Sequence, residues 1–358
     1  MKKKLLIVLL TAVLTATLVA GCGKNTSTEK QETGTTKAEA VDQRRVYVTA
    51  KWVKSVIDGN QPESKNYVIE EVSYPATAAE SPTYNSGHIP GAVHASIMEV
   101  EDATGDEKGA YNLLPAEEVK ANILSHGITK DTTVIMYGDD ICGVARQAYA
   151  YIWAGVENVK ILNGNLDAWT SAGYELEKKA NDNVAASDFG VSVPAHPEYW
   201  LSIEDAVYKV ANDSNFKLVS IRSEAEWLGQ TSGYTYMDKA GEPKGAVWGK
   251  GPHTASDVAD FVNSDGTVKE LSELEKIWAD CDFTLKNDIS FYCGTGWRAC
   301  VPFLVMYQEG YNNISIYDGG WYEYLMHDDY PVQVGDPSSK DVKYTTVREL
   351  PTGKASAE

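Results

Sequence analysis

The chain contains an internal repeat, and this repeat restricts the folds that it can adopt. Three landmarks recur at a nearly constant spacing: residues 158–169 match 313–324 and Gly155 matches Gly310 at a shift of 155 positions, and residues 91–93 match 245–247 at a shift of 154. So steady a register indicates a duplicated domain, and 358 residues are too many for one ordinary hydrophobic core. We expect domains over residues 46–180 and 199–335, joined by a polar linker over 181–198.

Each copy alternates short β-branched runs with helical patterns. The runs lie at 67–69, 133–137 and 159–162 in the first copy and at 217–221, 289–292 and 314–317 in the second. Strands that alternate with helices predict an α/β fold, in which each domain is a parallel sheet with helices on both faces. Ligands of such sheets bind in the loops at the carboxyl ends of the strands.

One of these loops, within residues 289–300, carries the residues of greatest chemical interest. Cys293 follows a strand-like run, and a helical pattern follows Arg298. Gly294 and Gly296 allow the backbone to curl, so that successive N–H groups and the helix N-terminus can face one anion. Because such surroundings stabilise a thiolate, we predict that Cys293 is ionised and nucleophilic at neutral pH.

The first 21 residues predict an export signal. Three lysines precede an apolar run from Leu5 to Ala20, which ends in a small-residue cleavage site before Cys22. A cysteine in this place resembles a bacterial lipobox, so we expect that Cys22 is lipidated and anchors the protein to the cell membrane outside the cytoplasm. The alternatives are an ordinary signal peptide or a single anchoring helix, for which the run is short. Residues 22–45 are polar and predict a flexible tether.

Charge and cysteine spacing exclude several classes of protein. The formal net charge is −19, and loss of the three lysines of the signal would change it to −22. So acidic a chain is a poor partner for nucleic acid, or for anionic lipid beyond the anchor itself. The cysteines and the six histidines show no metal-ligand spacing, so we predict no metal site and no cofactor.

Four motifs are distributed over the two copies. They are Ser-Gly-His-Ile-Pro-Gly-Ala at 86–92, Leu-Val-Ser-Ile-Arg-Ser at 218–223 with Trp-Leu-Gly at 227–229, Cys-Gly-Thr-Gly-Trp-Arg at 293–298, and Tyr-Asp-Gly-Gly-Trp at 317–321. In combination they resemble the motifs of the rhodanese family, and the pair of copies resembles a tandem-domain sulfurtransferase of the thiosulfate or mercaptopyruvate kind.

The resemblance implies roles for particular residues. It implies a persulfide on Cys293, a substrate-binding arginine at Arg222, and a loop that holds the anion, formed by Gly294, Thr295, Gly296, Trp297 and Arg298. It also implies a small anionic sulfur donor, thiosulfate or 3-mercaptopyruvate, and an acceptor that is cyanide, a thiol or a redox protein. The donor stays open, because Thr295 replaces the lysine of vertebrate-type thiosulfate enzymes and the serine of mercaptopyruvate enzymes, and Arg298 replaces the threonine of the latter.

The first copy lacks the reactive loop. The shift of 155 places Gly138 opposite Cys293, and Asp139 and Asp140 would bring negative charge into an anion-binding loop. We therefore predict that the first domain is catalytically inactive and completes the cleft. Cys142 lies four residues out of register and is interpreted as structural, with a redox or resolving role as the alternative.

Three functions are consistent with these patterns. The first is a sulfurtransferase that works through a Cys293 persulfide. The second is a rhodanese-like phosphatase, whose loop would be one residue longer, and the third is a lipoprotein that binds an anion or a partner without turnover. Cys293→Ser should abolish activity in the first two cases and preserve affinity in the third. The polar tail at 336–358 is expected to be disordered or to form a strap across the first domain.

Overall fold

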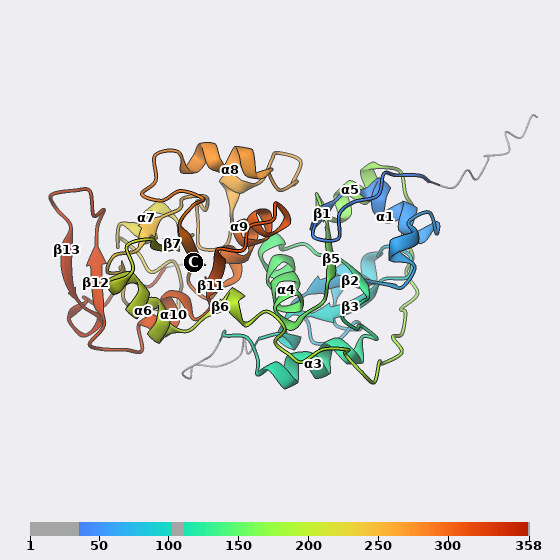
Figure 1. Ribbon diagram of the computed structural model, residues 1–358, viewed down its shortest axis with the longest axis horizontal. Coiled ribbons are helices and arrows are strands. Elements are labelled where there is room, and N and C mark those ends of the chain that lie inside the picture. Colours follow the sequence, from blue (N-terminus) through green and yellow to red (C-terminus); the bar gives the residue numbers. More distant parts are fainter. Residues whose placement is uncertain (1–35, 102–110, 357–358) are drawn as a thin grey trace, which may run out of the picture. The chain divides into compact units, whose positions relative to one another are not determined.

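The computed structural model describes residues 36–101 and 111–356 (Figure 1). The expected export signal, the expected lipidation site Cys22 and most of the expected tether lie outside these residues. None of the helices within the described ranges has the length and apolar character that a membrane crossing requires.

The first domain is built on a five-stranded parallel sheet with the strand order β1-β5-β4-β2-β3. Its strands are β1 (Tyr47–Val48), β2 (Tyr67–Ser73), β3 (Val93–Ser96), β4 (Thr133–Tyr137) and β5 (Asn158–Leu162). Its helices are α1 (Ala50–Ile57), α2 (Pro82–Ser86), α3 (Ala116–Ser125), α4 (Ile141–Ala154) and α5 (Asn165–Ser171), with short 3₁₀ turns at Pro62–Ser64 and Ile97–Glu99.

The second domain repeats this sheet with the order β6-β11-β10-β7-β9, again parallel throughout. Its strands are β6 (Trp200–Leu201), β7 (Phe216–Ser220), β9 (Val247–Trp248), β10 (Asp288–Tyr292) and β11 (Ile314–Tyr317). Its helices are α6 (Ile203–Asn212), α7 (Glu224–Trp227), α8 (Leu271–Trp278), α9 (Trp297–Gln308) and α10 (Gly320–Tyr324), with 3₁₀ turns at Pro197–Tyr199, Ala259–Phe261 and Val347–Glu349.

The two sheets correspond strand for strand, which confirms the predicted α/β fold with a parallel sheet and surrounding helices in each copy. Strand β4 begins at residue 133 and β10 at residue 288, so the central strands are related by the same shift of 155 positions that the sequence repeat shows. Both strands are buried along nearly their whole length. This burial explains why their sequences are runs of apolar residues without alternation.

The domains meet through the helices that follow these central strands. Figure 1 shows α4 beside α9, and residues of both helices belong to one continuous hydrophobic cluster. The rings of Tyr149 in α4 and Phe303 in α9 meet edge to face, with centroids 5.1 Å apart. Small residues such as Ala145, Ala148 and Ala299 are fully buried in the same cluster, so the two helices can approach closely.

The segments that flank the domains are more ordered than the sequence suggested. The expected tether ends earlier than residue 45, because Asn60 and Gln61 donate to the carbonyls of Thr36 and Ala38. Arg44 then contacts the second domain, where its guanidinium donates to two carbonyl oxygens at the end of α9. The sequence did not predict these contacts, because they are made by backbone carbonyls and polar side chains, which also occur in flexible segments.

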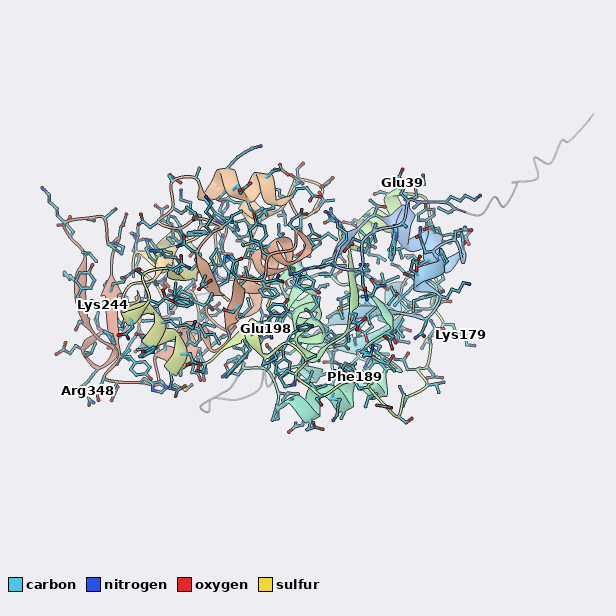
Figure 2. All side chains as sticks on the ribbon, in the orientation of Figure 1. Glu39, Lys179, Phe189, Glu198, Lys244 and Arg348 are labelled. Atoms are coloured by element: carbon cyan, nitrogen blue, oxygen red, sulfur yellow. The ribbon has the colours of Figure 1, made fainter. Side chains whose placement is uncertain are left out.

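The linker follows the first domain, with Phe189 buried against it, and reaches the second domain near Glu198 (Figure 2).

The expected tail contains a strand, β13 (Lys343–Thr346), that pairs with β12 (Pro331–Val334), and β12 pairs with β8 (Glu242–Pro243). Lys244 and Arg348 mark this antiparallel sheet in Figure 2. Farther along, Lys354 accepts from Ser232 and donates to Asp238 through backbone groups. The tail therefore packs on the second domain up to Ser356, and the two expectations of disorder or a strap across the first domain are wrong for these residues.

Candidate active site

Cys293 lies at the carboxyl end of β10, the central strand of the second sheet, and is 1% exposed. The loop after it ends at Gly296, which caps α9 with a φ of +91°. Only glycine adopts this left-handed conformation without strain. The sequence therefore places the thiol where a strand turns sharply into a helix, as the glycine spacing predicted.

The start of α10 fixes the conformation of the cysteine loop. The backbone N–H of Trp321 donates to the carbonyl of Cys293 at 2.9 Å, and that of Tyr322 donates to the carbonyl of Gly294 at 3.0 Å. A side chain on Gly320 would come within 2.6 Å of both carbonyl oxygens, and its φ is +55°. The Asp-Gly-Gly-Trp motif is thus the backbone support of the reactive loop.

The N–H groups of this loop remain available. Within the described part of the chain, the backbone N–H groups of residues 294–298 donate to no protein acceptor. Buried N–H groups almost always find an acceptor, and these lie at the N-terminus of a twelve-residue helix, where the helix dipole attracts negative charge. The loop has the properties of an anion-binding site beside the thiol.

Arg298 is nine-tenths or more buried and is anchored by a carboxylate. Its two terminal nitrogens donate to the two oxygens of Glu226 at 2.8 and 3.0 Å. They also donate to the carbonyl of Thr254 and to the hydroxyl of Tyr234, each at 3.0 Å. Burial opposes the ionisation of Glu226, but the guanidinium charges of Arg298 and Arg222 lie close to its carboxylate. They lower the pKa of Glu226 to about 2. The Arg298 Nε, in contrast, has no hydrogen-bond partner among the described residues.

Arg222 is not among the residues that line the cavity over Cys293, and the expectation that it binds substrate stays a prediction. Its guanidinium is fully buried and donates to the carboxylates of Glu226 and Glu242. The carbonyls of Gly241 and Ser232 take its other N–H groups. A buried guanidinium with four protein acceptors is a structural cross-link, and it holds Glu226 in place for Arg298.

Cys293 opens into a cavity of about 330 Å³ between the domains. The second domain contributes Tyr234, Tyr236, Ala255, Ser256, Cys293, Thr295, Trp297 and Arg298, and the first domain contributes Tyr74, Tyr111, Asp140 and Cys142. The degenerate loop of the first domain thus faces the reactive loop of the second. A larger cavity of about 650 Å³, beside Gly138 and Asp139, is lined by no cysteine.

Trp297 connects the loop to the first domain. Its indole N–H donates to the carboxylate of Glu101 at 2.5 Å, and Glu101 accepts from the Nε of Arg146 at 2.7 Å. Burial raises the pKa of Glu101 to about 7 against the opposing charge of Arg146. Trp297 also packs against Gly143, where an added Cβ would lie 3.2 Å from the indole ring. The first domain therefore positions one wall of the cavity.

The four cysteines in the described part of the chain are free thiols. Burial, and the nearby Asp140 carboxylate, raise the pKa of the Cys142 thiol, and burial also raises that of Cys300. These two thiols are therefore protonated at neutral pH. Cys300 lies one helical turn into α9, where its Sγ donates to the carbonyl of Gly296 at 3.2 Å, in line with a structural role.

Several residues that line the cavity were not predicted from the sequence. Tyr234 contacts Gly294 so closely that a Cβ on the glycine would overlap the tyrosine ring. Tyr234 and Tyr236 lie in a segment without regular secondary structure, and Tyr111 follows the undescribed residues 102–110. No motif marks these positions. Glu226 had a signal, since it falls four residues after Arg222 and three after the helix-capping Ser223.

Comparisons with known proteins identify the family of the chain. A rhodanese-like domain model matches residues 49–172 and 204–327. The chain therefore belongs to the rhodanese family, as a member with two such domains. Among the described residues, no group of three or more His, Cys, Asp and Glu side chains is placed to hold a metal ion.

The relatives carry sulfurtransferase names. Thiosulfate sulfurtransferase YnjE of Escherichia coli is 39% identical over 254 residues, which cover 71% of this chain and 57% of that protein. A putative thiosulfate sulfurtransferase of Haloferax volcanii is 28% identical over 81% of this chain and 97% of its own length. The chain thus spans little more than half of YnjE but almost all of the second relative.

Two solved structures are similar to this chain in both fold and sequence. The crystal structure of YnjE superposes with a TM-score of 0.75 at 35% identity, covering 82% of this chain and 68% of that chain. An anaerobic ergothioneine biosynthesis enzyme from Chlorobium limicola, solved with its natural substrate trimethyl histidine, also has a TM-score of 0.75, with 32% identity over 82% of this chain and 71% of that chain.

Proposed function

We propose that the protein is a sulfurtransferase that carries sulfur as a persulfide on Cys293. The observation that carries this proposal is the buried thiol beside five consecutive backbone N–H groups that have no acceptor among the described residues. Such donors stabilise the negative charge of a persulfide and cost no reorganisation when it forms. The names of the relatives support the same activity.

The reaction consists of two displacements that share one covalent intermediate. The Cys293 thiolate attacks the outer sulfur of thiosulfate, the sulfur–sulfur bond of the donor breaks, and sulfite leaves with the electron pair. With 3-mercaptopyruvate, the carbon–sulfur bond of the donor breaks, the electron pair leaves as the enolate of pyruvate, and the enolate takes up a proton. An acceptor, cyanide or a thiolate, then attacks the outer sulfur of the persulfide and returns the electron pair to Cys293. The Nε–H of Arg298 is a further donor for the bound anion.

The phosphatase reading is less consistent with the site. A phosphate in a loop of this kind needs a guanidinium that can donate two parallel N–H groups to it. Both terminal nitrogens of Arg298 are already held by Glu226, Thr254 and Tyr234. The loop is also one residue shorter than that of the rhodanese-like phosphatases.

Intact mass spectrometry tests the activity. Protein that starts at residue 36 is incubated with thiosulfate and then with cyanide. Cys293→Ser is treated in the same way, as is the matched control Cys281→Ser, whose thiol is half-buried and outside the cavity. We expect the wild type and Cys281→Ser to gain one sulfur atom and to lose it as thiocyanate forms. A wild type that gains no sulfur from thiosulfate or from mercaptopyruvate would exclude the proposal and favour the binding reading.

We also propose that the protein is a lipoprotein, anchored through Cys22 to the cell membrane outside the cytoplasm. The basis is the lipobox-like sequence that ends at Cys22. Expression in a bacterium supplied with an alkyne-labelled fatty acid should label the wild type but not Cys22→Ala. Label on both proteins, or on neither, would contradict the anchor.

A further inference from the structure

The cavity over Cys293 has walls that are unlike its floor. Four tyrosines and a tryptophan line it, namely Tyr74, Tyr111, Tyr234, Tyr236 and Trp297. The rings of Tyr236 and Tyr111 lie 5.5 Å apart between centroids, and those of Tyr236 and Tyr234 lie 5.4 Å apart. Tyr74 and Tyr236 are 55% and 47% exposed, so the aromatic surface continues to the mouth of the cavity. Thiosulfate is a small hydrated dianion, so contact with aromatic rings adds little to its binding.

The charges of the lining point in the same direction. Among the described residues that line it, the charged side chains are those of Asp140 and Arg298. Arg298 is neutralised by its bidentate pair with Glu226, whereas Asp140 forms no ion pair with any described residue. Asp140 is held by its own helix, since it caps α4 and accepts from the N–H of Cys142 at 2.8 Å. A carboxylate that lines the same cavity as these rings attracts a cation.

Electrostatics at longer range favours the same ligand. The formal charge of −19 attracts cations towards the surface and disfavours anions. The faces of aromatic rings carry negative potential, and cages of such rings bind methylated ammonium groups. A persulfide on Cys293 would add a negative charge at the floor of the same cavity and strengthen the attraction.

We propose that the sulfur acceptor is a small organic cation, a thiol that carries a methylated ammonium group, bound by the ring of Tyr236 and the carboxylate of Asp140. The inference rests on the proposed persulfide chemistry of Cys293 for its sulfur-transfer step. In that step the acceptor thiolate attacks the outer sulfur, the bond between that sulfur and the Sγ of Cys293 breaks, and Cys293 regains its thiolate. The acceptor leaves as a persulfide, and no further reactant is needed.

Binding is tested first, with two probes of the same shape. Choline carries the charged trimethylammonium group, and 3,3-dimethylbutanol replaces it with a neutral tert-butyl group. Calorimetry on the tether-truncated wild type should give roughly tenfold tighter binding of choline. Tyr236→Leu and Asp140→Asn should each remove most of this preference, whereas Tyr236→Phe should keep it. Tyr208→Leu, an exposed tyrosine on α6 that is remote from the cavity, is the matched control and should also keep it.

Transfer is tested second, with thiocholine and 3,3-dimethylbutanethiol as acceptors from the loaded enzyme. The two thiols differ in intrinsic reactivity, so the measure is the ratio of their kcat/KM values in each variant relative to wild type. We expect this ratio to fall several-fold in Tyr236→Leu and to be unchanged in Tyr208→Leu.

The outcomes separate this inference from the proposed function. Equal binding of choline and its neutral analogue by a wild type that forms the persulfide would overturn the cationic acceptor and leave the sulfurtransferase intact. Preferential binding of choline by a protein that forms no persulfide would support the cation site and overturn the transfer. An unchanged transfer ratio in Tyr236→Leu, folded by circular dichroism, would overturn the role of the tyrosine.

Discussion

Arg146 and Asp318 form a buried ion pair that joins the two domains. Nη1 of Arg146, in α4 of the first domain, donates to the carboxylate of Asp318, in the turn before α10 of the second. Asp318 also accepts from the backbone N–H of Leu113 and from the indole N–H of Trp200. Since α10 supports the cysteine loop, the pair connects the first domain to the loop that holds Cys293 in the second.

Removal of this arginine should destabilise the protein strongly. Arg146→Ala leaves Glu101 and Asp318 as buried carboxylates without a counter-charge, and breaking a buried pair in this way costs about 3–5 kcal/mol. Urea unfolding followed by fluorescence should show the loss as a lower midpoint. Arg348→Ala, which breaks an exposed pair with Asp328 and Asp329, is the matched control and should show no measurable change. A similar midpoint for both variants would contradict the prediction that the buried ion pair of Arg146 stabilises the fold.

Gly294→Ala should inactivate the enzyme through Tyr234. The new Cβ would overlap the tyrosine ring, so either Tyr234 or the loop after Cys293, which would hold the proposed persulfide, has to move. We expect kcat/KM for thiosulfate to fall by at least about 100-fold, the effect of losing one well-placed donor to a developing anion. A double-mutant cycle checks the cause. In the Tyr234→Ala background the same substitution should cost several-fold less, and equal costs in both backgrounds would show that Tyr234 is not the obstacle.

Because of His126, the stability of the protein should fall as pH rises into the alkaline range. Its imidazole contacts the carboxylates of Glu99 and Glu70, which raise its pKa to about 10 although burial opposes ionisation. The folded state therefore holds a proton that the unfolded state releases near pH 6.5. The resulting stability is fully present below pH 6.5 and is lost as pH rises from there to about 10.

The expected loss across this window is about 3–5 kcal/mol, at 1.36 kcal/mol for each unit of pKa difference. It is measured as the difference in free energy of unfolding between wild type and His126→Gln, so that other titrating groups cancel. This difference should shrink with rising pH. A difference that stays constant between pH 6.5 and 10 would show that His126 is neutral in the folded protein.

Much of the fold follows from local sequence, and part of the site does not. The apolar runs at 133–137 and 289–292 predicted the central strands, with β4 matched at both ends and β10 beginning one residue earlier, because buried parallel strands need uninterrupted apolar runs. The conformation of the loop from Cys293 to Arg298 could be predicted because the spacing of its glycines indicates where the backbone turns. Tyr234 and Tyr236 could not be found in this way, since they reach the cavity from an irregular segment that is held by backbone bonds to the tail. The pairing of Arg222 could not be predicted either, because its burial and its bond to Glu242 depend on tertiary contacts between distant residues.

Arginine-to-lysine substitutions should separate the roles of Arg222 and Arg298. Lysine keeps the charge but cannot reproduce the forked hydrogen bonds of a guanidinium. Arg222→Lys leaves the buried carbonyls of Gly241 and Ser232 without donors, so we expect a loss of about 1–3 kcal/mol in stability with an unchanged KM for thiosulfate. Arg298→Lys removes the Nε–H, the proposed further donor to the bound anion, and should lower kcat/KM for persulfide formation by about tenfold or more. Unfolding midpoints and single-turnover rates are measured on both variants. A raised KM in Arg222→Lys without loss of stability would support the substrate-binding role that the sequence suggested for it.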